Sequence, residues 1–173
     1  MTAAPPDRHP RTLHLPTGET ITIRASGRDD GGELFEAEAL LPPGFSGPPR
    51  HRHRGQTETF TVVEGRLRVV RGRETGVLPA GESVTVPPSV VHAFANPFDE
   101  PARIRVREIP AGPLEEQFRA LAGSGRIPPL GLLAAINVRH GLPFAVHGVP
   151  DVVQEPVWRL LAWAHARGRH RRR

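Results

Sequence analysis

The sequence predicts a mainly β protein, a sandwich or barrel of short strands followed by a helical extension. Between residues 19 and 110, short runs alternate apolar and polar residues, and Gly, Pro or Asp separates one run from the next. After Pro110 the apolar residues recur instead at helical spacing. The chain has 173 residues, which is enough for one sizeable hydrophobic core but not for two full domains.

Residues 1–18 contain four prolines and are predicted to form an irregular N-terminal arm with one short strand at Thr12–Leu15. The β unit is predicted over residues 19–110. Its alternation is clearest over residues 103–107, where arginines would face water and β-branched residues would face the core. The runs that predict strands in this unit are Thr20–Ala25, Glu33–Leu41, Glu58–Val63, Arg66–Arg71, Ser83–Val86, His92–Ala95 and Arg103–Glu108.

Residues 111–173 are predicted to form a helical extension that ends in an Arg-rich tail. The first helix has Pro113 at its start, acidic residues in its first turn and Gly123 at its end, which are typical helix boundaries. The predicted helices are Pro113–Leu121, Pro129–His140 and Pro156–Arg167. The last one has a broad apolar side, so we expect the helices to pack on the outside of the β unit or across a dimer contact.

The basic residues are concentrated at the C-terminal end. All 23 are arginine, and five of them lie in the last seven positions. The remaining 18 arginines balance 18 acidic residues, so the folded body has no basic face and nucleic-acid binding is not expected. We find no secretory signal and no apolar run long enough to span a bilayer, which predicts a cytoplasmic protein without a membrane partner.

The chain contains no cysteine and no tyrosine. The missing cysteine excludes disulfides, thiolate metal sites, iron–sulfur clusters and a cysteine nucleophile. The missing tyrosine excludes phenolic acids and bases. Proton chemistry must therefore use His, Asp, Glu or metal-bound water.

The stretch RHRHRGQTE, residues 50–58, predicts a metal site. On a strand, His51 and His53 project from the same face because they are two residues apart, so both imidazoles can reach one ion. Glu58 follows after a glycine-containing turn, and His92 projects from an otherwise apolar run. We predict that these four side chains bind one divalent transition metal, either Fe, Mn, Ni or Zn. The alternative is a basic turn with solvated histidines.

These residues resemble the two signature motifs of the cupin superfamily. The first motif is His51-x-His53-x4-Glu58-x6-Gly65, and the second is Gly81-x5-Pro87-x-Ser89-x2-His92-x3-Asn96. The resemblance covers about residues 19–110 and is to compact bacterial single-domain cupins. It implies a small jelly-roll barrel, or double-stranded β-helix, with the metal inside.

The sequence departs from the cupin pattern at two turn positions. Ser89 stands where the family usually has glycine, and Phe45 stands where it has glycine six residues before the first histidine, with Gly44 one place early. All four ligand positions match. Asn96 is expected to hold the turn before Pro97 and not to touch a ligand. The histidines that match no spacing are read as surface or packing residues: His9, His14, His140, His147, His165 and His170.

Four protein ligands leave a coordination position open, which a catalytic metal site keeps and a structural one lacks. Strand parity predicts a dry, mostly apolar pocket around the ion, suited to a small organic ligand. The side chains expected to point inward are Phe60, Val62, Leu67, Val69, Val84, Val86, Phe94, Ile104 and Val106.

The leading hypothesis is a dioxygenase-type oxidoreductase that acts on a chelating enol, phenol or keto acid, with Glu58 as base once it leaves the ion. The first alternative is a redox-neutral isomerase, cyclase or lyase that uses the metal as a Lewis acid. The second is a non-catalytic regulatory module that binds a small ligand. Exposed edge strands in a small barrel favour a homodimer in all three cases.

Overall fold

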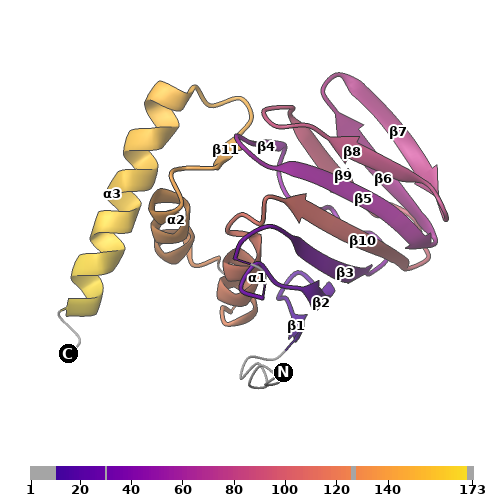
Figure 1. The fold of residues 1–173 in the computed structure, drawn as a ribbon, viewed down its shortest axis with the longest axis horizontal. Helices are drawn as coiled ribbons and strands as arrows, with labels where there is room; N and C mark the ends of the chain where they lie inside the picture. The colour runs from indigo at the N-terminus through magenta and orange to yellow at the C-terminus, as the bar shows by residue number, and fades with distance from the viewer. Residues whose placement is uncertain (1–10, 30, 126–127, 171–173) are drawn as a thin grey trace.

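The computed structural model describes residues 11–29, 31–125 and 128–170, without the side chains of residues 169 and 170. Two antiparallel β-sheets face each other, and three helices gather at one end of them (Figure 1). This architecture confirms the predicted mainly β jelly roll with C-terminal helices. Most of the predicted arm, residues 1–10, and the last arginines, residues 171–173, lie outside the described residues.

The first sheet has six strands in the order β1-β2-β3-β10-β5-β8, and the second has five in the order β11-β4-β9-β6-β7. Every pairing between these strands is antiparallel. The strands of the first sheet are β1 (Thr12–His14), β2 (Thr20–Ala25), β3 (Phe35–Leu41), β10 (Ala102–Ile109), β5 (Thr57–Glu64) and β8 (Ser83–Val86). Those of the second are β11 (Phe144–Val146), β4 (His51–His53), β9 (His92–Ala95), β6 (Arg66–Arg71) and β7 (Glu74–Pro79).

The alternation that predicted β10 is confirmed. Ile104 and Val106 are buried between the sheets, whereas Arg105 and Arg107 lie on the outer face. There, the guanidinium groups form ion pairs with glutamates of the adjacent strand β3, at 3.3 Å for Arg105 and 3.1 Å for Arg107. The period-2 pattern thus separates a dry face from a charged face along one strand.

The core between the sheets is built from the side chains that strand parity predicts. Seven of the nine expected inward residues are buried. The other two, Val84 and Phe94, are half-buried and pack against this core. Phe35 and Leu41 of β3 are also fully enclosed. One apolar core therefore fills most of the space between the two sheets.

Three helices follow the barrel: α1 (Leu114–Ala122), α2 (Leu130–Arg139) and α3 (Asp151–His170). The apolar side of α1 packs on the barrel core, and the ring of Phe118 lies 6.1 Å from that of Phe35. Helix α2 lies between α3 and the rest of the molecule (Figure 1). None of the helices in the described part of the chain is long and apolar enough to cross a membrane.

The helical extension differs from its prediction in two ways. Helix α3 begins at Asp151 and not at Pro156, because the carbonyl of Pro150 accepts hydrogen bonds from the N–H groups of Val153 and Gln154 and so starts the helix earlier. Pro156 therefore lies inside the helix, where it supplies no N–H. The extension also contributes strand β11, which helical periodicity could not predict.

The two turns that depart from the cupin pattern keep the backbone that glycine favours. Ser89 has a φ of 66°, in the left-handed region, and Gly44 has a φ of 71° one place before Phe45. The side chain of Asn96 donates hydrogen bonds to the carbonyls of Pro42 and Glu100, at 3.0 and 2.8 Å. Asn96 thus holds the turn at Pro97, as expected, and does not join the metal-ligand cluster.

Candidate metal centre

Strand β4 places two histidines on one face. His51 and His53 are each 5% exposed and point into the barrel, while Arg52 between them points to the outer side. The neighbouring strand β9 brings a third histidine alongside, because His51 pairs with His92 in the antiparallel register. The residue spacing and the sheet register together gather three imidazoles.

Glu58 completes the cluster from the opposite sheet. It lies on β5 at the same inward parity as Phe60 and is 4% exposed. Its Oε2 atom is 2.8 Å from Nε2 of His92 and 3.4 Å from Nε2 of His53. One potential ligand atom from each of the four residues lies within 4.8 Å of the other three. The structure therefore brings together all four residues that the sequence singled out.

Backbone carbonyls orient two of the imidazoles. Nδ1 of His51 lies 2.8 Å from the carbonyl oxygen of Pro49, and Nδ1 of His92 lies 3.0 Å from that of Val90. A carbonyl oxygen only accepts hydrogen bonds, so in both rings Nδ1 carries a proton and Nε2 faces the other members of the cluster. In the neutral form of such a ring, Nε2 is the atom that would bind a divalent metal.

His53 faces a carboxylate instead of a carbonyl. Its Nδ1 lies 3.5 Å from Oε1 of Glu108, which comes from strand β10 and is fully buried opposite Glu58. Its Nε2 is buried and forms no hydrogen bond of good geometry within the described residues, although Oε2 of Glu58 lies 3.4 Å away. Sequence analysis missed Glu108, although its position at the inward parity of β10, after Ile104 and Val106, was a usable signal.

The buried surroundings shift the pKa values of these groups. Burial, together with the positive charges that the other two imidazoles can carry, lowers the pKa of His51 to about 4. Burial alone would raise the pKa of Glu58, but the imidazoles of His53 and His92 outweigh it and lower that pKa to about 2. Burial raises the pKa of Glu108 to about 7. The cluster thus holds Glu58 as a carboxylate and His51 as a neutral imidazole.

The four residues fit a metal ion. Neutral imidazoles and an ionised carboxylate are ligands that first-row divalent metals accept, and they would leave room for a further ligand. The buried Nε2 of His53 meets no hydrogen-bond criterion within the described residues and faces Oε2 of Glu58 at 3.4 Å, as two ligand atoms that point at one ion would. The cluster could therefore hold one divalent cation.

The other histidines of the described chain do not join this cluster. His14 is exposed and hydrogen-bonds Thr20, and His140 lies 3.4 Å from Glu116. His147 is exposed and His165 is half-buried. This agrees with their expected surface or packing roles. His9 and the side chain of His170 lie outside what the structure describes.

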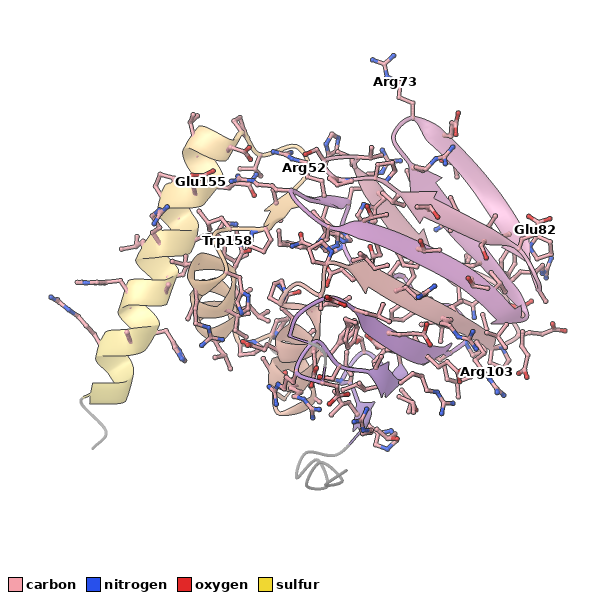
Figure 2. The ribbon with its side chains drawn as sticks, viewed as in Figure 1. Arg52, Arg73, Glu82, Arg103, Glu155 and Trp158 are labelled. Carbon is pink, nitrogen blue, oxygen red and sulfur yellow. The ribbon has the colours of Figure 1, made fainter. Side chains whose placement is uncertain are left out.

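The outer face of β4 is charged and contacts helix α3. Arg52 donates to both carboxylate oxygens of Asp151, each at 2.7 Å, and Arg54 lies 2.6 Å from Glu155. Glu155 and Trp158 lie on the side of α3 that faces the barrel, toward Arg52 (Figure 2). The strand that carries two candidate ligands is thereby anchored to the helical extension.

Comparison with known proteins identifies the barrel. The family model described as "Cupin domain" matches residues 37–106. An RmlC-like cupin from Shewanella frigidimarina is similar with a TM-score of 0.51 and 21% identity, over 64% of this chain and 93% of that chain. The Cnp3 cupin domain of Schizosaccharomyces pombe gives a TM-score of 0.50 and 13% identity, over 69% and 77%.

A third similar structure, described as a sugar phosphate isomerase from the cupin superfamily of Silicibacter pomeroyi, has 28% identity and a TM-score of 0.47. The match covers 54% of this chain and 60% of that one. A comparison with curated protein sequences gave no match. These likenesses concern the barrel fold and leave the chemistry to be argued from the site.

Proposed function

The chain belongs to the cupin superfamily, and from this premise we propose that it is a metal-dependent oxidoreductase of the dioxygenase type acting on a small organic molecule. The observation that carries the proposal is the buried convergence of His51, His53, Glu58 and His92, with ligand atoms within 4.8 Å of one another. A metal that takes more than four ligands would have a coordination position left over after these four side chains, and substrate could bind there.

Each of the four side chains has a proposed part in this chemistry. When bound, an Fe(II), Mn(II) or Ni(II) ion would supply a Lewis acid and a centre for electron transfer. The three imidazoles would hold the ion through Nε2, since Nδ1 faces a carbonyl in His51 and His92 and the carboxylate of Glu108 in His53. Glu58 would bind the ion as a carboxylate and would serve as a base once it leaves the ion.

The apolar side chains around the cluster support a small organic substrate. Phe60 is fully buried with its ring 6.1 Å from that of His92, and Phe94 lies 5.0 Å from Phe60. Such walls exclude water and offer few charged partners. A substrate that chelates through enol, phenol or keto acid oxygens would be held by the metal and not by ion pairs.

Oxygen consumption tests this proposal. Protein reconstituted with Fe(II), Mn(II), Ni(II) or Zn(II) is supplied with a panel of enols, phenols and keto acids, beside a His51→Ala/His53→Ala variant. We expect oxygen uptake with a redox-active metal in the native protein and none in the variant. No oxygen uptake under any condition would contradict the proposal.

Two other outcomes of the same experiment would identify different functions. Turnover under nitrogen with Zn(II) would indicate a redox-neutral isomerase, cyclase or lyase that uses Lewis-acid chemistry. Saturable binding of a small molecule without turnover would indicate a regulatory binding module. A lyase with a tyrosine base is disfavoured, because the chain has no tyrosine.

We also propose a cytoplasmic homodimer without a nucleic-acid partner, in which residues 19–110 form the barrel and residues 111–173 the extension. Exposed apolar side chains on α3 support a self-association surface: Val152, Val153, Val157, Leu160 and Trp163. Size-exclusion chromatography with light scattering tests the dimer. A monomer at micromolar concentration would contradict it.

A further inference from the structure

Strand β11 lies outside residues 37–106, yet it adjoins the candidate metal site. It pairs with β4 along the full length of both strands, with Phe144 opposite His53. Beyond the paired residues, the N–H of Arg54 donates to the carbonyl of Pro143 at 2.7 Å. The helical extension therefore adds a strand directly beside the two histidines.

The ring of Phe144 covers these histidines. Its centroid lies 4.9 Å from the centroid of His51 with an angle of 29° between the rings, and 6.2 Å from the centroid of His53. Directly opposite and diagonal residues on one face of a strand pair are close enough for such contacts. The side of the cluster next to β11 is thus closed by an apolar ring.

Two side-chain amides hold β11 in place. Asn137 of α2 is 2% exposed, donates to the carbonyl of Phe144 and accepts from its N–H, both at 3.1 Å. Gln154 of α3 does the same for Val146, at 3.3 Å to the carbonyl and 2.9 Å from the N–H. These amides satisfy the outer edge of β11 as a further strand would, so the position of Phe144 is fixed.

Helix α3 also supports the ring from behind. Trp158 meets Phe144 edge to face, with centroids 6.5 Å apart and 76° between the planes. The aromatic ring is therefore packed between the indole of α3 and the imidazoles of β4. A ring held on two sides in this way forms a wall of fixed position.

We propose that Phe144 is a specificity-determining residue of the metal site. Its ring closes the approach past His51 and His53, keeps water from that side and limits the size of the chelating molecules that reach the ion. A phenyl ring offers no ligand atom, so the effect is on access and not on the number of ligands. This inference rests on the proposed metal site.

Removal of the metal by a chelator tests the role of Phe144. Full-length protein is loaded with Co(II), and its transfer to EDTA is followed by the visible absorption of the bound ion. We expect Phe144→Ala to retain a full equivalent of Co(II) but to release it about 10-fold faster than native protein, because the hydrophobic shell controls access. Leu40→Ala is the control, since Leu40 is 47% exposed on β3 and lies outside the proposed self-association surface.

The outcomes separate this inference from the proposed function. Release at the native rate from Phe144→Ala, with Co(II) bound stoichiometrically to both proteins, would overturn the role of Phe144 and leave the metal site intact. If the native protein binds no Co(II), both proposals fall.

A second variant guards against misfolding. If circular dichroism shows that Phe144→Ala does not fold, the release rate is measured on Phe144→Leu instead. This variant keeps most of the apolar volume and removes the flat ring. We expect about 3-fold faster release from Phe144→Leu, as the shell becomes less complete. An unchanged rate in this folded variant would overturn the inference.

Discussion

The two faces of strand β4 carry polar side chains that are used in different ways. On the inner face, His51 and His53 are buried and cluster with Glu58 and His92. On the outer face, Arg52 and Arg54 are only partly buried and each meets a carboxylate of α3. Alternation over the four residues 51–54, the last of them just beyond β4, thus separates candidate metal ligands from structural anchors.

This difference has a physical origin in solvation. The outer ion pairs remain in contact with water, which screens them and makes each worth little. The inner groups have lost their water, so their charge states depend on one another and on burial. Changes on the inner face should therefore have large effects that depend on pH and metal, and changes on the outer face should have small ones.

The largest expected effect is the response of the inner face to acid. The pKa of His51 is lowered to about 4, below the value of about 6.5 in an unfolded chain, so the unfolded state binds the proton first. The contribution that neutral His51 makes to the free energy of unfolding is fully present above pH 6.5. It is lost as the pH falls toward 4. His51 alone is expected to lower the stability of the metal-free protein by up to roughly 3 kcal/mol across this window, whereas protonation of Glu108, whose pKa is raised, acts in the opposite direction.

Urea unfolding at pH 7 and pH 4.5 measures this loss. The matched variant is His51→Gln, which cannot be protonated and should lose less stability than native protein over the same interval. An equal loss in the two proteins would show that His51 does not carry the pH dependence.

A smaller effect is expected at Glu108, which lies behind His53 on the inner face. Glu108→Gln removes the carboxylate that faces Nδ1 of His53. Carboxylates in this position orient the imidazole and increase its basicity, so we expect metal affinity to fall about 10-fold. Competition with a chromophoric chelator measures the affinity. Glu64→Gln is the control, because Glu64 is exposed and pairs with Arg103.

The smallest effect is expected on the outer face. Arg52→Ala/Arg54→Ala removes the contacts to Asp151 and Glu155. Because partly exposed ion pairs contribute little, we expect Tm to fall by no more than about 3 °C and metal affinity to stay within twofold of native. A loss of metal as large as that of Glu108→Gln would break the distinction between the two faces.

Much of the fold and the pair His51 and His53 could be predicted from period-2 spacing, whereas Glu58 and His92 needed the signature motifs as well. Period-2 spacing indicates which side chains share a face of a strand, wherever that strand lies in the sheet. It applies to the two histidines, which are two residues apart, and to the alternation in residues 103–107. The signature motifs then linked His92 to the pair. The register that places His92 beside His51 came only from the structure.

The parts that could not be predicted depend on contacts between distant segments. Strand β11 has three residues, too few to show a period, and it exists because β4 and two side-chain amides satisfy its backbone. Strand β7 carries Gly76 in a mostly exposed segment, so it shows no clear alternation. The start of α3 was misplaced because Pro156 resembles a first-turn proline, and its true start depends on Pro150.

The central claim is that side chains from both sheets meet at one metal ion, and metal content tests it most directly. Native protein and His51→Ala/His53→Ala are purified without added ions, and each is measured by inductively coupled plasma mass spectrometry. The account predicts a transition metal approaching one equivalent in the native protein and almost none in the variant. The same metal content in both proteins, whether high or low, would contradict it.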